Sequence, residues 1–159
     1  RRQRQMCIRD RLSLLVCLMF TGCSNSETNS TSRGLTDFAH IEEEYLATID
    51  SLNWPDGIAL PDKLEDEDTG ASFQVGYGET RASYLWEYSW MKEWLDTYNT
   101  DPERAEKALE ELEKAFDMPY MGIDRCDDAT RNYLRENIDK AKLGDPSGFT
   151  ESIRANYAN

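Results

Sequence analysis

The stretch from residue 83 to residue 116 reads SYLWEYSWMKEWLDTYNTDPERAEKALEELEKAF and decides the fold. Its first half is rich in aromatic residues, and its second half repeats apolar residues at three- and four-residue spacing, which is typical of amphipathic helices. Between the halves, Asp101 can act as an N-cap and Pro102 as a first-turn proline. The sequence therefore predicts two consecutive helices that are joined by a short turn.

The predicted helix that begins at Pro102 has one apolar stripe opposite a charged side. On the charged side, oppositely charged residues four positions apart can form ion pairs. These pairs are Glu103 with Lys107 and Glu110 with Lys114, and the apolar stripe consists of Ala105, Ala108, Leu109, Leu112 and Phe116. We expect this helix to pack its apolar stripe against the rest of the molecule.

The aromatic segment at residues 83–98 separates its tryptophans when it is drawn as a helix. At about 100° per residue, Trp90 and Trp94 share a face, whereas Trp86 falls on the opposite side. The first face also holds Tyr84, Tyr88, Met91, Leu95 and Tyr98, and the second holds Ser89, Glu93 and Thr97. We expect Trp90 and Trp94 in the core and Trp86 at the surface. An exposed Trp86 would be the best aromatic contact for a partner or a sugar-like ligand.

The remaining pattern after residue 34 predicts a mainly α fold. Amphipathic stretches and turn signals divide it into elements. These are a helix at 36–52, an irregular loop at 53–67, one short strand near 73–77, a helix from 127 or 128 to 143, and a short final helix that opens at 145–146. Residues 35–159 are expected to form a single helical domain, in which four to five amphipathic helices pack as a small irregular bundle with at most one short β-strand or hairpin.

The N-terminal part resembles the precursor of a bacterial lipoprotein. An apolar run at 12–20 is too short for a membrane helix, which needs about 20 residues, and is typical of the h-region of an export signal. Phe20–Cys23 reads FTGC, which is similar to a lipobox except that Phe replaces the usual Leu-like residue. The resemblance implies that the signal peptide at 12–22 is removed and that Cys23 is lipidated at the extracytoplasmic face of the cell membrane. Residues 23–34 would then be the lipidated cysteine and a disordered tether.

Residues 1–11 resemble a translated sequencing adapter. The string RRQRQMCIRD is what the adapter codons CGT CGG CAG CGT CAG ATG TGT ATA AGA GAC encode, and Arg11 would use the adapter's last two bases. We expect these residues to be foreign, and we expect the native gene to encode a different basic segment before residue 12.

The chain is strongly acidic. Its 18 basic and 31 acidic residues give a formal net charge of −13, which becomes about −17 without residues 1–22, where five of the basic residues and one of the acidic residues lie. A surface of this sign repels phosphate backbones, which argues against nucleic-acid binding. It suits a basic or cationic partner in the cell envelope. We expect a monomer that needs no cofactor.

The sequence also allows an expectation for two residues with reactive side chains, Cys126 and His40. Cys126 would be the only cysteine left beside Cys23 after signal removal, and the neighbouring Asp127 and Asp128 would raise its thiol pKa, so we do not expect a nucleophile. If Cys23 is not lipidated, a disulfide between Cys23 and Cys126 is the alternative. His40, the only histidine, falls near the polar face of the first helix and is expected to be exposed.

Acidic residues are densest at the end of the predicted loop. The candidates for cation ligands are Asp62, Glu65, Asp66, Glu67 and Asp68. Their spacing differs from that of an EF-hand loop, which alternates carboxylates around a central glycine and ends on a distant Glu. A metal site at 62–68 is therefore one hypothesis, and a solvated acidic loop is the other.

A second resemblance covers residues 53–157. The motifs that carry it are WPxG at 54–57, a Gly-rich turn, EWL at 93–95, DPxRA at 101–105 and LGDPSG at 143–148. In this order they are similar to small uncharacterised lipoproteins of actinobacteria, and the resemblance implies no activity. Some members carry a cysteine in the Trp-rich segment and another at the C-terminus. This chain has Ser89 and Asn159 there, which puts any disulfide of the family in doubt.

The sequence leaves two classes of function open. One is a lipid-anchored, non-catalytic envelope protein that binds a partner or a small ligand, and the other is an envelope hydrolase whose carboxylates do acid–base chemistry. The chain lacks HExxH, GxSxG, paired CxxC and P-loop motifs, and its carboxylates are too widely spread to single out a pair. We therefore favour the binding protein. A carboxylate buried in a cleft would bear on this choice.

Overall fold

A computed structural model of the chain describes residues 34–65 and 67–157. All of them belong to one compact unit, Ser32–Asn159. The predictions for the adapter, the signal peptide, Cys23 and the tether up to residue 33 lie outside the described residues, as does Asp66.

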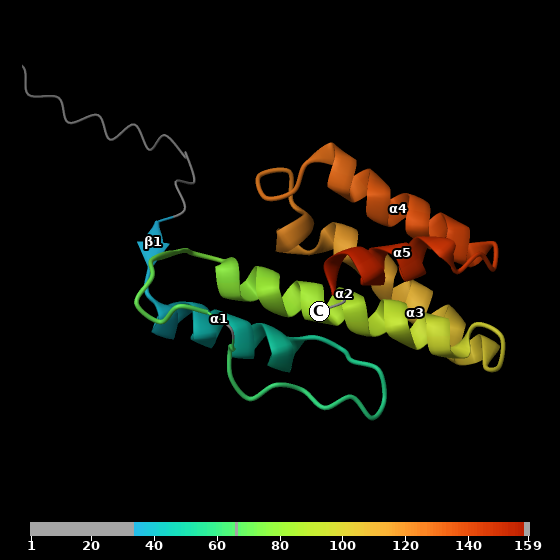
Figure 1. Ribbon diagram of the computed structural model, residues 1–159, viewed down its shortest axis with the longest axis horizontal. Coiled ribbons are helices and arrows are strands. Elements are labelled where there is room, and N and C mark those ends of the chain that lie inside the picture. Colours follow the sequence, from blue (N-terminus) through green and yellow to red (C-terminus); the bar gives the residue numbers. More distant parts are fainter. Residues whose placement is uncertain (1–33, 66, 158–159) are drawn as a thin grey trace, which may run out of the picture. The chain divides into compact units, whose positions relative to one another are not determined.

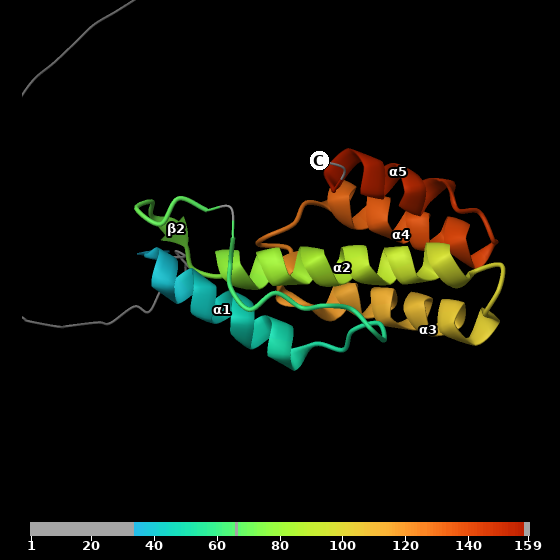
Figure 2. The same cartoon turned by 60° about the horizontal axis from the view of Figure 1, so that its bottom comes forward.

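The described residues form the small helical bundle that the sequence predicted. Their α-helices are α1 (Phe38–Ser51), α2 (Tyr77–Thr97), α3 (Pro102–Glu113), α4 (Asp128–Lys142) and α5 (Ser147–Asn156). Two 3₁₀ turns, η1 (Lys114–Asp117) and η2 (Pro119–Met121), connect α3 to the segment before α4. Figures 1 and 2 show α2 along the middle of the molecule, with α1 on one side and α4 and α5 on the other.

A two-stranded antiparallel sheet closes one end of the bundle. It pairs β1 (Leu35–Thr36) with β2 (Phe73–Gln74), with Leu35 opposite Gln74 and Thr36 opposite Phe73. The sequence predicted a strand near β2 but not its partner. A two-residue strand such as β1 has no periodicity of its own, so only the tertiary contact reveals it.

Aspartates cap three of the helices. Asp37 accepts a hydrogen bond from the backbone N–H of His40 at 3.0 Å, and Asp101 accepts one from Arg104 at 3.2 Å. The backbone N–H of Thr130 donates to Asp127 at 2.8 Å at the start of α4. The predicted cap at Asp101 is confirmed. The sequence left residues 127 and 128 open for the start of the next long helix, and the structure has Asp127 as the cap and Asp128 as the first helical residue.

The start of α2 is capped by another helix. Gly76 precedes α2 and has no side chain to cap it, and Glu44 of α1 takes that role. Glu44 accepts hydrogen bonds from the backbone N–H groups of Gly76 and Gly78, at 2.7 and 3.2 Å. Because a distant carboxylate satisfies these donors, α2 begins at Tyr77, six residues before the predicted start.

Trp86 is buried, so its predicted exposure is wrong. It is 1% exposed, like Trp90, and both indole N–H groups donate to the carbonyl of Asn53, at 2.8 and 3.1 Å. The prediction from helical periodicity assumed that only one side of α2 faces the core. In the structure, α1 and α3 both pack against α2. In addition, Leu52 and Trp54 pack against the core cluster that contains Trp86. The proposed surface contact through Trp86 therefore loses its basis, whereas the predicted burial of Trp90 and Trp94 is confirmed.

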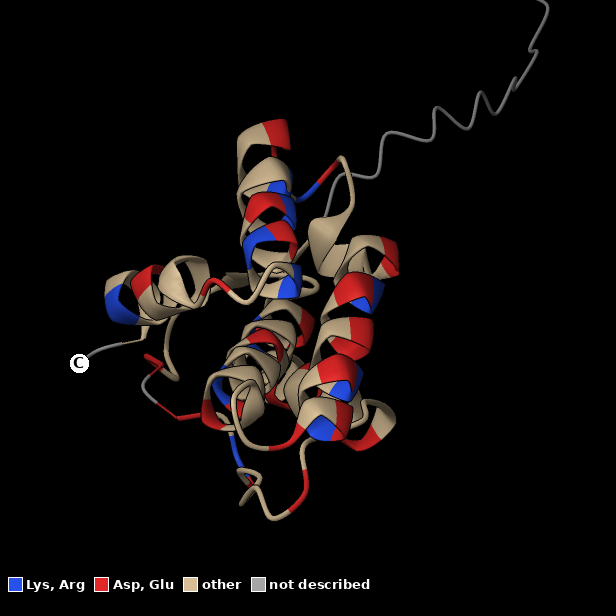
Figure 3. Ribbon diagram, turned by 90° about the vertical axis from the view of Figure 1, so that its right-hand side faces the viewer, with Lys and Arg blue, Asp and Glu red and all other residues tan. Residues whose placement is uncertain are grey.

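The outer faces of the bundle are charged. Figure 3 shows acidic residues spread over the helices rather than gathered at one place. Within the part of the chain that the structure describes, no helix combines the length and the apolar character needed to cross a bilayer.

Candidate functional site

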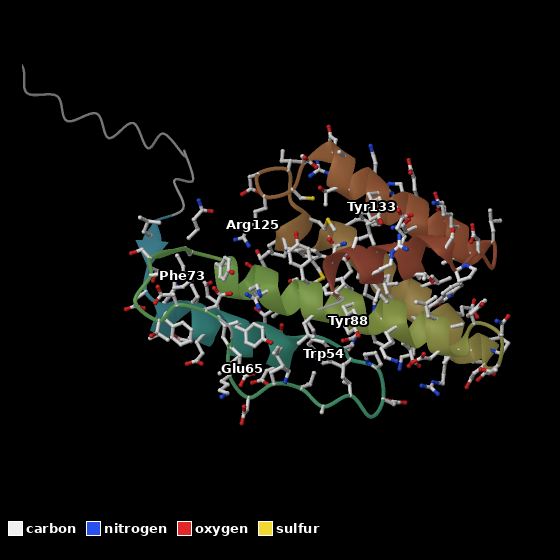
Figure 4. The ribbon with its side chains drawn as sticks, viewed as in Figure 1. Trp54, Glu65, Phe73, Tyr88, Arg125 and Tyr133 are labelled. Atoms are coloured by element: carbon white, nitrogen blue, oxygen red, sulfur yellow. The ribbon has the colours of Figure 1, made fainter. Side chains whose placement is uncertain are left out.

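A cavity of about 700 Å³ lies along α2. The α1 side contributes Tyr45 and the loop at residues 61–65, and the opposite side is made by η2, α4 and α5. In Figure 4, Glu65 lies on the α1 side of α2 and Tyr133 on the α4 side, and both line the cavity. A concave site of this size is typical of a small-molecule binding site.

Helical spacing brings the residues that α2 contributes onto one side. Arg81, Tyr84 and Leu85 are three and four positions apart, and Glu87 follows Tyr84 by three. The cavity therefore has an aromatic ring, a carboxylate and a guanidinium on a single rigid helix.

Glu87 is the most unusual of these groups because its carboxylate is buried. The side chain is 7% exposed, and its Oε2 accepts a hydrogen bond from the hydroxyl of Tyr120 at 2.7 Å. Burial raises the pKa of Glu87 from 4.5 to about 7, although the Tyr120 hydrogen bond favours the charged form. Among the described residues no basic side chain forms an ion pair with it.

Tyrosines surround Glu87. The rings of Tyr84 and Tyr120 meet edge to face, with centroids 5.5 Å apart, and the hydroxyl of Tyr157 donates to the carbonyl of Tyr84 at 3.3 Å. Burial is the main cause that raises the pKa of Tyr84, Tyr120 and Tyr157, and the nearby Glu87 carboxylate adds to it. These hydroxyl groups remain neutral hydrogen-bond donors at physiological pH.

The α1 end of the cavity carries charges that are already paired. Arg81 forms an ion pair with Glu67, and Lys63 forms one with Glu65 at 2.8 Å. Both members of the second pair are 62% exposed. Glu67 also accepts a hydrogen bond from the hydroxyl of Tyr77 at 2.7 Å.

Three of the five acidic residues that were candidates for metal ligands have other partners. Glu65 and Glu67 pair with basic side chains, and Asp68 accepts a hydrogen bond from the backbone N–H of Gly70 at 2.9 Å. Over residues 34–65 and 67–157, no group of three or more His, Cys, Asp or Glu side chains is placed to hold a metal ion. Asp66, which belongs to the hypothesis, lies outside those ranges.

His40 lies in the exposed environment that the sequence predicted, whereas the burial of Cys126 was not predicted. Cys126 is buried with a free thiol, and burial is the main reason why its pKa is raised, with Asp127 adding to the effect. The neighbouring Arg131 opposes the shift. His40 is exposed and lies 3.3 Å from Glu44. The raised thiol pKa that the sequence predicted for Cys126 is found, with burial rather than the neighbouring aspartates as its main cause.

Sequence analysis missed Glu87 and the tyrosines that converge on it. The available signal was a single acidic residue inside the aromatic run YLWEYSW at 84–90. A charged residue in such a run is either exposed to solvent or is a buried carboxylate, and buried carboxylates are often part of a functional site. Its partners Tyr120 and Tyr157 are 33 and 70 positions away along the chain, so the cluster becomes visible only in three dimensions.

The arrangement can do two kinds of chemistry. A carboxylate with a pKa of about 7 can exchange a proton near neutral pH, and the same carboxylate in its charged form can hold a cation. The aromatic rings supply contact area and the hydroxyl groups supply donors.

Comparisons with known proteins provide no precedent for this chain. No protein-family model, no curated protein and no solved structure matches it. Its function is therefore inferred from the cavity and from the residues that line it.

Proposed function

We propose that this protein is a non-catalytic binding protein of a bacterial cell envelope and that its ligand is a small molecule held in the cavity along α2. The observation that carries the proposal is the cavity itself, whose volume is about 700 Å³ and whose lining combines several tyrosine rings with a few convergent polar groups. Binding sites for small molecules share these properties.

The location belongs to the same proposal. The FTGC string at Phe20–Cys23 supports a lipid anchor on Cys23, with the bundle held outside the cytoplasm. Two acyl chains give a stable anchor where one would be marginal. The acidic surface supports solubility and a basic or cationic partner.

Blocking the cavity tests the binding function. A library of small fragments is added to the purified protein, and the backbone amide signals of Arg81, Tyr84 and Glu87 are followed by NMR. Thr130 is exposed and lines the cavity, so Thr130→Trp should obstruct it and abolish the shifts that the fragments cause. Thr150→Trp is the matched control, because Thr150 is exposed but does not line the cavity. Fragments that bind only elsewhere would contradict the proposal.

The lipid anchor has a separate test. Wild-type protein expressed with its signal peptide should partition into the detergent phase, and Cys23→Ser should remain in the aqueous phase, because the thiol is the site of acylation. An intact mass without lipid on the wild-type protein would refute the anchor and leave the cavity proposal untouched.

A hydrolase is the second candidate, and Glu87 is the observation that favours it. Its carboxylate is buried at a cavity and has a pKa of about 7, as a general acid or base requires. Among the residues that the structure describes, the other carboxylate that lines the cavity is Glu65, which is 62% exposed and paired with Lys63, so it lacks the environment of a second catalytic group. Release of nitrophenol from a panel of nitrophenyl esters and glycosides by wild-type protein, but not by Glu87→Gln, would establish the hydrolase and replace the non-catalytic proposal.

A further inference from the structure

We propose that the ligand of this cavity is an organic cation, a substituted ammonium group that sits against Glu87 and the tyrosine rings. The proposal rests on the binding function proposed above and names the class of ligand.

The first argument is that Glu87 is a buried acid without a cation. Its Oε2 receives the Tyr120 hydroxyl, and its Oε1 receives no hydrogen bond from the residues that the structure describes. Removing a carboxylate from water is costly unless a partner compensates for it. Because Glu87 lines the cavity, a bound cation could supply that partner.

The second argument is the kind of surface that surrounds the carboxylate. Tyr84 and Tyr133 line the cavity together with Tyr157, and the first two are 40% and 41% exposed. Aromatic faces attract alkylammonium groups through their quadrupole, and rings grouped around a carboxylate are a known solution for binding such cations. Once Glu87 is ionised, it would repel an anionic ligand, and a neutral ligand would leave its charge uncompensated.

The third argument is the balance of charge along the cavity. The basic side chains Arg81 and Lys63 lie at the α1 end and are neutralised by Glu67 and Glu65. They therefore do not compensate Glu87. The net charge of −13 for the whole chain would also attract a cation to the molecule.

Binding of a cation should depend on pH through Glu87. The titratable groups that face Glu87 are Tyr84 on its own helix, Tyr120 on η2, Tyr157 after α5 and Cys126 before α4. Each of these has a pKa raised above its ordinary value and stays neutral near pH 7, and Arg81, Lys63 and Glu65 farther along the cavity are paired. Glu87 is then the group that gains charge as pH rises through about 7, so affinity for a cation should rise with pH.

Choline and its uncharged isostere 3,3-dimethylbutan-1-ol are a matched pair of probes. In calorimetric titrations of the purified protein, choline should bind and the isostere should bind much more weakly. Choline should bind about tenfold more tightly at about pH 8 than at about pH 6, because the ionised fraction of Glu87 rises by that factor. Glu87→Gln should lose both the preference for choline and its pH dependence, whereas Glu103→Gln, at an exposed carboxylate of α3 that does not line the cavity, should keep both.

A variant at a ring outside the buried cluster provides an independent test of the contribution of the tyrosine rings to choline binding. Tyr133→Leu removes a half-exposed ring and should weaken choline about twofold to fivefold without changing binding of the isostere. Equal affinity for the two probes, or choline binding that Glu87→Gln and Tyr133→Leu leave unchanged, would overturn the cation proposal. If choline fails to bind while fragments bind in a way that Thr130→Trp abolishes, the cation proposal is overturned and the binding function stands. If no fragment binds in the cavity either, both are wrong.

Discussion

At the scale of single residues, opposing effects act on Glu87. Burial favours its protonated form, and the Tyr120 hydroxyl at 2.7 Å favours its carboxylate. Burial is the larger effect, so the pKa rises to about 7. A group whose pKa is raised on folding makes the folded state less stable as pH increases, because the unfolded chain loses the proton first.

Replacing Glu87 with Gln should therefore remove a pH-dependent loss of stability. Relative to Glu87→Gln, the wild-type protein should be most stable below pH 4.5 and should lose up to about 3 kcal/mol as pH rises through about 7. Urea unfolding followed by tryptophan fluorescence at several pH values measures this difference. Glu65→Gln, at a side chain that is 62% exposed, is the control and should change stability by less than about 0.5 kcal/mol at every pH. A difference between wild type and Glu87→Gln that is constant with pH would contradict the assignment.

Trp86 is the second residue whose environment the fold decides. Its ring is 1% exposed and its N–H donates to the Asn53 carbonyl, so Trp86→Ala should lower the free energy of unfolding by about 3 to 5 kcal/mol. Trp86→Phe keeps most of the volume and should cost less, chiefly the hydrogen bond at about 1 kcal/mol. Ile123→Ala is the control for an exposed apolar residue, since Ile123 is 90% exposed. Equal, small effects for Trp86→Ala and Ile123→Ala would mean that Trp86 is at the surface after all.

At the scale of elements, the close contact between α1 and α2 decides how these two helices lie against each other. Glu44 of α1 caps the first turn of α2, and the helices approach so closely that a Cβ atom on Gly78 would lie 1.8 Å from the carbonyl oxygen of Ile41. Only glycine permits this approach. Because α2 carries Arg81, Tyr84 and Glu87, the position of α1 also sets where these side chains lie.

Gly78→Ala should destabilise the protein although it lies in a helix. Helix propensity alone would stabilise the variant by about 1 kcal/mol, but the added methyl group meets backbone that cannot move aside without separating α1 from α2. We expect a net loss of at least about 2 kcal/mol in thermal or urea unfolding. Gly34→Ala is the matched control, because no atom lies within 4 Å of a Cβ at that position. A Gly78→Ala variant as stable as wild type would show that the two helices pack less closely.

At the scale of the whole molecule, the helices stabilise one another through two groups of core residues that meet on α2. One group gathers residues of α2, α3, α4 and α5, including Trp90, Leu112, Ile138 and Phe149, and the other joins Ile41, Tyr45 and Ile49 of α1 to Ala82 of α2. Packing of apolar side chains thus provides the type of interaction that stabilises helical bundles.

Removal of divalent cations should leave this stability unchanged. A core of packed helices needs no metal, and Glu65 and Glu67 are already paired with basic side chains. The melting temperature of the purified protein should be the same with and without a chelator, with a calcium-binding protein as the positive control for the chelator. A decrease of several degrees would support a structural cation site at residues 62–68, including Asp66.

Local signals made the helices predictable. These signals involve residues only a few positions apart in the sequence, so they can be recognised without the structure. Examples are the apolar stripe that begins at Ala105 and the capping residues Asp101 and Asp127. The mainly α fold followed from these signals, and the burial of Trp90 and Trp94 followed from the helical period of the aromatic segment at residues 83–98.

What only the tertiary structure decided depends on residues far apart in sequence. The sequence by itself determined where α3 begins and placed the start of α4 to within one residue, because a cap and an amphipathic period are local properties. It could not determine that α2 is covered on more than one side, that Glu44 caps it or that β1 pairs with β2. Nor could it place Glu87 against Tyr120 in a cavity. The pKa of Glu87 is raised because neighbouring helices exclude water from its carboxylate, and this burial exists only in the folded structure. The fold class is thus written in local patterns, and the candidate site is a product of packing.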